Sequence, residues 1–185
     1  MRIFLTGTAG FIGAQVARRL LERGDQVVGV DNLNSAYDVQ LKRWRLERIK
    51  DASGFEFHPI DILDRTALDD AWGEGAYDGV INLAARAGVR PSVEDPWIYA
   101  DTNVKGALNL LDLCRRDEVG KFVQASTSSL YGAHNEQPFA EEADTSRPLS
   151  PYAATKGAAE MLAHSYHHLH GLDVTVLRYF TVYGP

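Results

Sequence analysis

Cysteine is almost missing from this chain, because Cys114 is the only one among 185 residues. No internal disulfide can therefore form, and a reducing compartment such as the cytoplasm is expected. Cys114 ends an apolar stretch with helical spacing that begins at Leu108, so we expect a core position for its thiol. Long apolar runs are missing as well, and none approaches the length of a membrane span. The residues before Gly7 are too few for the core of a signal peptide, so the sequence predicts a soluble protein with no membrane partner.

An excess of positive charge is also missing. The formal net charge is −6 and the pI is near 5.5, which argues against nucleic acids and anionic membrane surfaces as partners. An anionic small substrate stays compatible, because local amides and arginines decide its binding. The length of 185 residues and the hydrophobic content of 45% favour one large domain with a sizeable core.

A metal site is not expected either. Four histidines crowd the end of one predicted helix, and His164 and His168 share one of its faces. Ser165 stands where the zinc-protease pattern requires a glutamate, so a solvated helix end is the better interpretation. A second predicted helix, Val39–Lys50, carries five basic residues and has Trp44 on its expected buried side. Its basic side is interpreted as a solvated face or as a neighbour of a bound phosphate.

Segments with strand and helix patterns alternate along the whole chain. The predicted strands are Arg2–Thr6, Gln26–Val30, Gly54–His58, Gly79–Leu83, Lys121–Ala125 and Asp173–Arg178. The predicted helices are Phe11–Arg23, Val39–Lys50, Arg65–Ala71, Pro96–Arg116 and Tyr152–His170. This alternation predicts an α/β fold, a doubly wound parallel sheet with helices on both faces.

Three glycines follow the first predicted strand. Gly7, Gly10 and Gly13 lie between that strand and a predicted amphipathic helix. This order lets backbone N–H groups and a helix N-terminus meet a pyrophosphate with no side chain in the way. The next predicted strand ends in Asp31, an acid placed to bind a ribose hydroxyl pair. We therefore expect a dinucleotide, and NAD rather than NADP, because Asp31 would repel a 2′-phosphate.

Tyr152 and Lys156 are four residues apart on a predicted helix, a spacing that places both side chains on one face. A lysine ammonium beside a phenol stabilises the phenolate, so Tyr152 is expected to act as a base near neutral pH. Four hydroxyl residues follow the fifth predicted strand, at the sheet edge where doubly wound folds bind ligands: Ser126, Thr127, Ser128 and Ser129. One of them is expected to bind both the substrate oxygen and Tyr152, and the others to cap the loop.

The order of these motifs resembles the extended short-chain dehydrogenase/reductase family, the nucleotide-sugar epimerases and dehydratases, over essentially all 185 residues. The family motif Thr-Gly-x-x-Gly-Phe-Ile-Gly stands intact at Thr6–Gly13, and its Arg-aromatic-Phe matches Arg178–Phe180. The resemblance implies a Rossmann fold, NAD as cofactor, and Thr127, Tyr152 and Lys156 as catalytic residues. It implies a cofactor site formed by Gly7, Gly10, Phe11, Ile12, Gly13, Asp31, Asn32, Asp61, Ile62, Leu83, Ala84, Ala85, Asn103, Ser126, Tyr152, Lys156 and Tyr179.

Within this family, the segments after Asp31, around Arg90 and at Thr181–Pro185 are similar to those of UDP-glucuronate 4-epimerases. The 4,6-dehydratases carry acids directly after the active-site threonine, and the decarboxylases an acid nearby, where this chain has Ser128 and Ser129. Without such an acid, elimination of water lacks its proton donor. The similarity implies epimerisation of UDP-glucuronate to UDP-galacturonate through a transient 4-keto sugar. The substrate-binding residues expected from it are Arg90, Thr127, Ser128, Ser129 and Thr181.

Size and assembly give further expectations. The chain ends in a turn directly after a predicted strand, so we expect residues 1–185 to be an NAD-binding domain with the catalytic residues. Most of a small C-terminal substrate domain would be absent from it. The resemblance implies a homodimer through the helices at Pro96–Arg116 and Tyr152–His170. Two other functions stay open: a non-catalytic NAD-binding module, and a related epimerase or reductase acting on another sugar.

Overall fold

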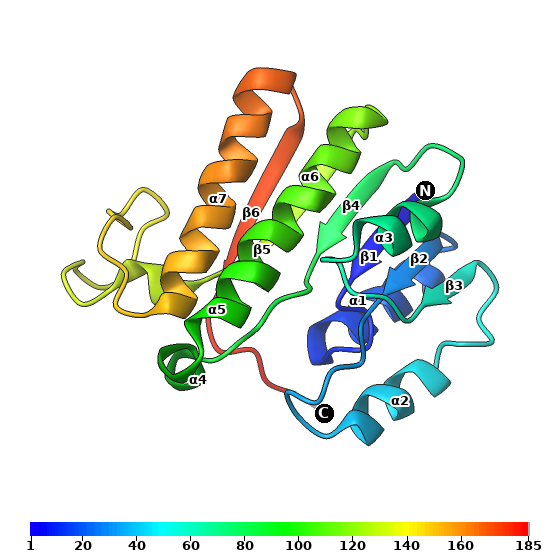
Figure 1. Ribbon diagram of the computed structural model, residues 1–185, viewed down its shortest axis with the longest axis horizontal. Helices are drawn as coiled ribbons and strands as arrows, with labels where there is room; N and C mark the ends of the chain where they lie inside the picture. The colour runs from blue at the N-terminus through cyan, green and yellow to red at the C-terminus, as the bar shows by residue number, and fades with distance from the viewer. Residues whose placement is uncertain (185) are drawn as a thin grey trace.

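A computed structural model describes residues 1–184 and shows one parallel sheet of six strands (Figure 1). The strands are β1 (Arg2–Thr6), β2 (Gln26–Val30), β3 (Phe55–His58), β4 (Gly79–Asn82), β5 (Lys121–Thr127) and β6 (Asp173–Tyr179). Their order across the sheet is β3-β2-β1-β4-β5-β6. The chain turns one way from β1 through β2 to β3 and the other way from β4 to β6. A doubly wound sheet binds its ligand at such a switch point, beside β1 and β4.

All six predicted strands are confirmed, with ends that differ by no more than two residues. The helices are α1 (Phe11–Glu22), α2 (Val39–Glu47), α3 (Arg65–Trp72), α4 (Val89–Glu94), α5 (Pro96–Tyr99), α6 (Gly106–Arg116) and α7 (Pro151–His170). None of the helices within residues 1–184 has the length and apolar character needed to cross a membrane. Cys114 is buried in α6 as expected, and burial raises the pKa of its thiol.

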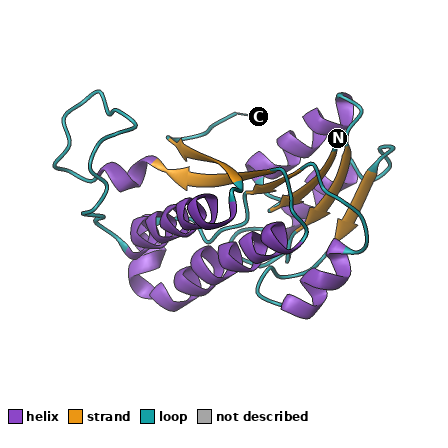
Figure 2. Cartoon of the chain, turned by 90° about the horizontal axis from the view of Figure 1, so that it is seen from above, coloured by secondary structure: helices purple, strands orange, loops and turns teal. Residues whose placement is uncertain are grey.

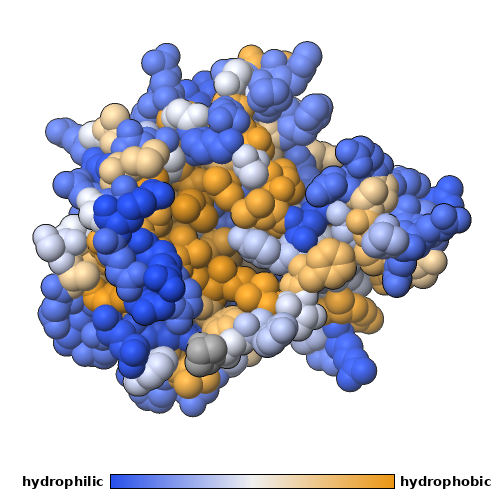
Figure 3. All heavy atoms as spheres, turned by 180° about the vertical axis from the view of Figure 1, so that it is seen from behind, coloured by the Kyte–Doolittle hydropathy of each residue, from blue (hydrophilic) through white to orange (hydrophobic). Residues whose placement is uncertain are grey.

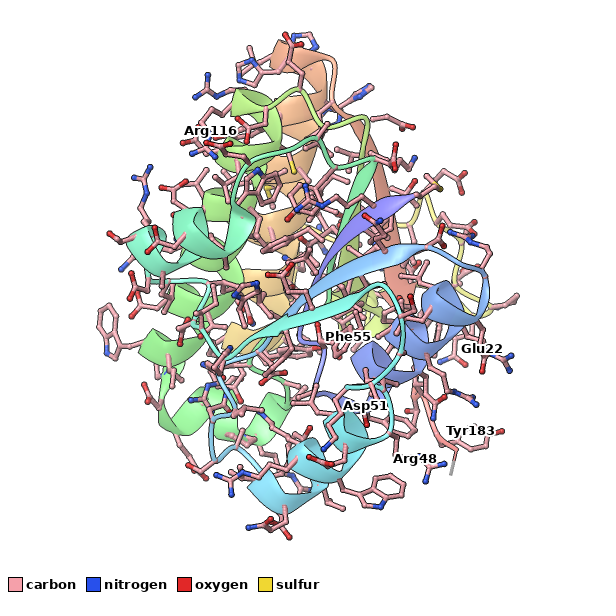
Figure 4. All side chains as sticks on the ribbon, turned by 90° about the vertical axis from the view of Figure 1, so that its right-hand side faces the viewer. Glu22, Arg48, Asp51, Phe55, Arg116 and Tyr183 are labelled. Atoms are coloured by element: carbon pink, nitrogen blue, oxygen red, sulfur yellow. The ribbon has the colours of Figure 1, made fainter. Side chains whose placement is uncertain are left out.

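Helices cover both faces of the sheet (Figure 2). Neighbouring residues of a strand point to opposite faces. Phe4 therefore packs into a core with α3, α6 and α7, whereas Leu5 packs on the other side with α1. Both side chains are fully buried. Figure 4 views the sheet from the β3 side, with Arg116 of α6 on one side and Glu22 of α1 on the other.

One face of the sheet is only partly covered within the described residues. α1 and its core cluster lie over β1 and β2, and over β4 to β6 the same face shows apolar side chains in a hollow (Figure 3). The strand register places Ile81, Val123 and Thr175 side by side on this face, with Leu177 two residues further along β6. Leu177 is 38% exposed. We refer to these four residues as the open face.

The single helix predicted over Pro96–Arg116 is wrong. The structure divides it into α5, a π-helical segment η1 (Ala100–Lys105) and α6. The short helix α4, which starts after Gly88 with φ 105°, was not predicted. A π turn contains one residue more than an α turn, and no residue type marks it. The division of the helix therefore depends on what it packs against rather than on helix propensity.

A chain of buried polar side chains crosses the sheet beneath its carboxyl edge. The Thr6 hydroxyl donates to Asn82 Oδ1 at 2.7 Å, and Asn82 Nδ2 donates to Gln124 Oε1 at 2.9 Å. Gln124 donates in turn to the carbonyl of Ala125. These residues belong to β1, β4 and β5, so their hydrogen bonds fix the relative heights of the three strand ends from which the candidate site is built.

Candidate active site

The turn between β1 and α1 requires its glycines for steric reasons. Gly7 has φ 69°, a left-handed conformation that side chains disfavour. A Cβ atom at Gly13 would lie 2.0 Å from the carbonyl oxygen of Gly7. Gly10 caps α1 without a side-chain hydrogen bond, so the first amides of α1 stay available to a ligand. An uncapped N-terminus of this kind suits a phosphate.

Asp31 lies buried at the end of β2, where the sequence predicts a ribose-binding acid. It accepts hydrogen bonds from the amides of Ala9 at 3.2 Å and Leu33 at 2.9 Å, so it is fixed to the glycine turn. The ammonium of Lys42 lies 3.4 Å from Asp31 Oδ1. Lys42 is only 4% exposed, whereas Trp44 is 57% exposed, so the burial expected for Trp44 is wrong. The helix also ends at Glu47 rather than at Lys50.

A hollow beside Asp31 suits the adenosine part of a dinucleotide. It is lined by residues from four loops at the carboxyl edge and from β2, α2 and η1: Gly7, Gly10, Val30, Asp31, Asn32, Asn34, Ala36, Tyr37, Lys42, Ile60, Asp61, Ile62, Leu83, Ala84, Ala85, Ala87 and Thr102. Asp61 accepts from Asn32 Nδ2 at 2.7 Å and from the amide of Leu63 at 2.9 Å. The bond from Asn32 joins the loops after β2 and β3 into one wall, and the bond from Leu63 fixes Asp61 within its own loop.

A second hollow contains the expected catalytic residues. Thr127, Tyr152 and Lys156 line it together with Ser126, Ser128, Ser129, Tyr179 and Thr181. Thr127 Oγ1 accepts from the amide of Ser129 at 3.1 Å, so this hydroxyl is held at the start of the turn after β5. The ring of Tyr152 packs edge-on against Tyr99, with 6.2 Å between ring centroids. The structure thus brings the predicted triad together from β5 and α7.

Lys156 is the buried cation of this hollow. It is 3% exposed and has no hydrogen bond or ion pair to another side chain within residues 1–184. Burial lowers the pKa of its ammonium from 10.5 to about 8, although Glu160 one turn further along α7 opposes this shift. A buried, unpartnered ammonium that lines a cleft is placed to stabilise a phenolate or to donate to a ligand hydroxyl.

The two hollows form one cleft along the carboxyl edge of the sheet. Both are lined by Gly7, Gly10, Tyr37, Leu83, Ala85 and Ala87, so they meet at the glycine turn. A dinucleotide fits this arrangement, since the phosphate-binding amides of α1 lie between Asp31 at one end and Lys156 at the other.

Two expected site residues lie outside the cleft itself. Asn103 lies behind it and bonds both the amide and the carbonyl of Arg86, and its Nδ2 also donates to Thr155 Oγ1 at 3.1 Å. It supports the cleft wall rather than lining it. Arg90 is exposed on α4 and lines neither hollow. Pro185, the last residue of the Thr181–Pro185 segment, lies outside the described residues.

Sequence reasoning missed several residues at the site. Lys42, Asn34 and Tyr37 line the first hollow. The sequence could have predicted a role for Lys42, because a lysine in the helix after β2 is close enough along the chain to reach the acid at the end of β2. Within residues 1–184, no group of three or more His, Cys, Asp or Glu side chains is placed to hold a metal ion.

The fold and the cleft define an α/β dinucleotide-binding protein with a tyrosine and a buried lysine grouped at the carboxyl edge of its sheet. Residues 3–185 match the family described as NAD dependent epimerase/dehydratase family. The chain belongs to this family. The predicted family and fold are thereby confirmed, and so is NAD as the cofactor.

Curated relatives and solved structures agree with this assignment. The chain is 55% identical over 181 residues to UDP-glucuronate 4-epimerase of Thermodesulfobacterium geofontis, covering 98% of this chain and 56% of the relative. It is 44% identical over 184 residues to UDP-glucuronate 4-epimerase 2 of Arabidopsis thaliana, covering 99% of this chain and 42% of the relative. This chain therefore spans about half the length of the relatives that it matches.

Two solved structures superpose closely on the chain. UDP-glucuronic acid 4-epimerase from Bacillus cereus, in complex with UDP-glucuronic acid and NAD, has a TM-score of 0.90 at 37% identity, covering 100% of this chain and 58% of that one. UDP-glucose 4-epimerase of Thermus thermophilus, in complex with NAD, has a TM-score of 0.87 at 39% identity, covering 100% and 57%. The similarity includes epimerases of more than one sugar.

Proposed function

We propose that the complete protein epimerises UDP-glucuronate at C4 to give UDP-galacturonate. The observation that carries this proposal is the grouping of Thr127, Tyr152 and Lys156 in one hollow that opens onto the glycine turn. The names of the relatives support a nucleotide-sugar 4-epimerase, and UDP-glucuronate is the substrate in several of them.

The chain's own residues perform proton transfer and charge stabilisation in this proposal. Tyr152, as phenolate, takes the proton of the sugar 4-hydroxyl, either directly or through the hydroxyl of Thr127. The ammonium of Lys156 stabilises that phenolate. NAD, when bound, supplies the acceptor and later the donor of the C4 hydride. Tyr152 then returns the proton to O4 of the 4-keto sugar after the sugar has presented its other face, so no net oxidation results.

The residues of the cleft fit NAD in four places. The free amides at the start of α1 bind the pyrophosphate, and Asp31 binds the adenosine ribose. Asp61 and Ile62 lie where the adenine is expected. Lys156 donates to the nicotinamide ribose from the other end of the cleft.

The preference for a uronate is the finer part of the proposal. Ser128 and Ser129 line the hollow beside Thr127 and present hydroxyls where dehydratases and decarboxylases of the family carry acids. Hydroxyls bind a sugar carboxylate without repelling it. The second candidate is a UDP-glucose 4-epimerase, because a solved structure of that name superposes nearly as well.

The test uses the polypeptide encoded by the complete reading frame. UDP-glucuronate is expected to be converted at least about tenfold more efficiently than UDP-glucose. Tyr152→Phe is expected to lower kcat about a hundredfold or more, since the proton acceptor is lost. Tyr166→Phe, on the same helix but outside the cleft, is the matched control and should retain full activity. A Tyr152→Phe variant within about twofold of the parent would remove Tyr152 as the base.

The division into domains also belongs to this proposal. Residues 1–185 act as the NAD-binding domain with the catalytic residues, and a substrate domain outside them completes the nucleotide-sugar pocket. The alternative is a non-catalytic NAD-binding module. NAD binding by residues 1–185, together with conversion of sugar by the complete polypeptide only, supports the division. NAD binding without conversion by either polypeptide favours the module.

A homodimer and a cytoplasmic location complete the proposal. α6 and α7 pack side by side and leave Leu108 and Met161 exposed, as expected for helices that meet a second copy. Trp97 of α5 is 79% exposed beside them. Size-exclusion chromatography with light scattering tests the dimer, and Met161→Glu should shift it to monomer. The single cysteine supports a reducing compartment.

A further inference from the structure

Glu160 carries the acidic side chain nearest to the catalytic groups along α7. It lies one helical turn beyond Lys156, and residues four apart on a helix are neighbours on its surface. A carboxylate in this position is expected to pair with the buried ammonium of Lys156, since unpaired buried charges are unfavourable. The structure shows a different arrangement.

The carboxylate of Glu160 is bound by β5 and β6 instead. Arg178 of β6 contacts both of its oxygens, with Nε 3.1 Å from Oε1 and Nη2 2.8 Å from Oε2. The hydroxyl of Ser126 on β5 donates to Oε1 as well. The ion pair is largely shielded from water, with the side chains of Arg178 and Glu160 20% and 13% exposed. Two parallel contacts between an arginine and a carboxylate fix the orientation of the carboxylate and also balance its charge.

Arg178 is itself held from two further sides. Its Nη1 donates to the carbonyl of Glu141 at 2.9 Å, and its guanidinium lies 5.3 Å from the centre of the Tyr131 ring. Tyr131 stacks on Phe139, and Phe180 follows in the same stack. The loop between β5 and α7 therefore closes over the ion pair and keeps Arg178 pointing at Glu160.

We propose that Arg178 and Ser126 hold the carboxylate of Glu160 away from its helical neighbour. The ammonium of Lys156 thereby stays unpaired and free to act in the cleft. Glu160 and Arg178 are positioning residues, because they neither contact Tyr152 nor line the second hollow. They act through Lys156. The value of a free ammonium rests on the proposed function, whereas the arrangement of charges does not.

Among the described residues, Glu160 is the charged side chain that acts on the pKa of Lys156. Several other elements also pack against α7. The charged and titratable groups of these elements are Asp173, Arg178 and Tyr179 of β6, Lys121 of β5, Tyr131 of the short helix η2 (Ser128–Tyr131), Tyr99 of α5, the Asp101–Lys105 pair of η1, Asp112, Cys114, Arg115 and Arg116 of α6, and the exposed Arg90 and Glu94 of α4. The segment from Ser126 to Ser129, which begins in β5, contributes hydroxyls only. Release of Glu160 is therefore the change that would give Lys156 a partner.

The test measures the pKa of Lys156 directly in the complete polypeptide. Lysines labelled with ¹³C at Cε are titrated by NMR, and Lys156→Met identifies the signal. Arg178→Gln is expected to raise the pKa of Lys156 by about one unit or more, because the released Glu160 pairs with it. Arg178→Gln with Glu160→Gln should return the pKa to the parental value or below. Arg115→Gln, which removes an arginine of a surface pair on α6, should change nothing.

Activity gives the second measurement. The single Arg178→Gln variant should lose about tenfold in kcat, and the double variant should recover most of it at the same pH. A parental pKa in the Arg178→Gln variant, or a double variant that recovers neither pKa nor kcat, overturns the proposal. If Arg178→Gln fails to fold, Ser126→Ala takes its place and should raise the pKa of Lys156 by a smaller amount; an unchanged value there overturns the proposal equally. A parent without epimerase activity that shows the expected NMR pattern refutes the proposed function and leaves the charge arrangement standing.

Discussion

At the scale of single residues, Lys156 destabilises the fold in the same charged form that the proposed reaction requires. Its ammonium is buried, and no carboxylate or hydroxyl of residues 1–184 compensates it directly. The lowered pKa of about 8 means that the folded state disfavours the charged form of Lys156. A residue selected for stability alone would be apolar at this position.

The replacement Lys156→Met should stabilise the fold at neutral pH while abolishing activity. The fall in pKa from 10.5 to about 8 corresponds to roughly 3 kcal/mol of destabilisation, present below pH 8 and relieved between about pH 8 and 10.5. Urea unfolding of the complete polypeptide at pH 7 should show a gain of this order, and the gain should vanish toward pH 10.5.

Lys121→Met supplies the matched control for this prediction. Lys121 pairs with Asp173 at the surface, so its removal should change the free energy of unfolding by no more than about 0.5 kcal/mol. A Lys156→Met variant that is less stable than the parent at pH 7, with the same pH dependence, would contradict the assignment of an uncompensated buried charge.

Residues with a local pattern were predictable, and residues brought together by the fold were not. Asp31, Tyr152 and Lys156 stand at fixed offsets in a strand or helix, so their spacing together with the glycine turn predicts that they belong to one site. Glu160 and Arg178 belong to different elements, and nothing in their local sequence predicts that they bind each other. The pairing depends on how α7 packs on β6, which is a tertiary effect.

At the scale of elements, the β1–α1 turn is the most constrained. Gly13 stands in the first turn of α1, and its Cα faces the carbonyl of Gly7 so closely that a Cβ would lie 2.0 Å from the oxygen. Gly13→Ala should therefore lower the free energy of unfolding by more than about 3 kcal/mol or prevent folding. Urea unfolding and NAD titration of the same sample measure the effect on the fold and on the cleft.

Gly120→Ala is the matched control for the turn. A Cβ at Gly120 would meet its nearest atom, the carbonyl oxygen of Asp78, at 3.5 Å, which is ordinary contact. The change should cost no more than about 1 kcal/mol. Equal effects at the two positions would show that the close approach at Gly13 relaxes in solution.

The elements also show where sequence patterns fail. The strands were predictable because apolar runs bounded by glycine and polar residues leave few alternatives. The segment from Pro96 to Arg116 has helical propensity throughout, so its division by η1 could not be predicted from the sequence. α4 was missed because its start depends on Gly88, whose conformation no neighbouring residue indicates.

At the scale of the whole molecule, the sheet has unequal coverage on its two faces. The side with α3, α6 and α7 buries a continuous core, whereas the other side shows an apolar hollow (Figure 3). Leu177 of the open face is 38% exposed. Contiguous apolar surface of this kind binds apolar dyes and promotes association.

The polypeptide of residues 1–185 should therefore bind the dye ANS in its folded state. Leu177→Asp should reduce the dye fluorescence about twofold, because it places a charge on the open face. Leu149→Asp is the matched control, since Leu149 is 70% exposed in the loop before α7 and lies outside the open face. Equal fluorescence in all three proteins would mean that the open face is closed in solution.

In the π-helical segment η1, the number of residues matters as much as their identity. Asn103 reaches both Arg86 and Thr155 because η1 holds one residue more than an α-helical turn. Removing one residue of Ala100–Lys105 other than Asn103 would restore α spacing with α5 and α6 nearly in phase, and it would remove the bulge from which Asn103 reaches Arg86 and Thr155. One wall of the cleft would lose the support of Asn103 although every side chain that lines the cleft was still present. A substitution scan would pass over most of this segment, whereas a scan of single-residue deletions would find it at once.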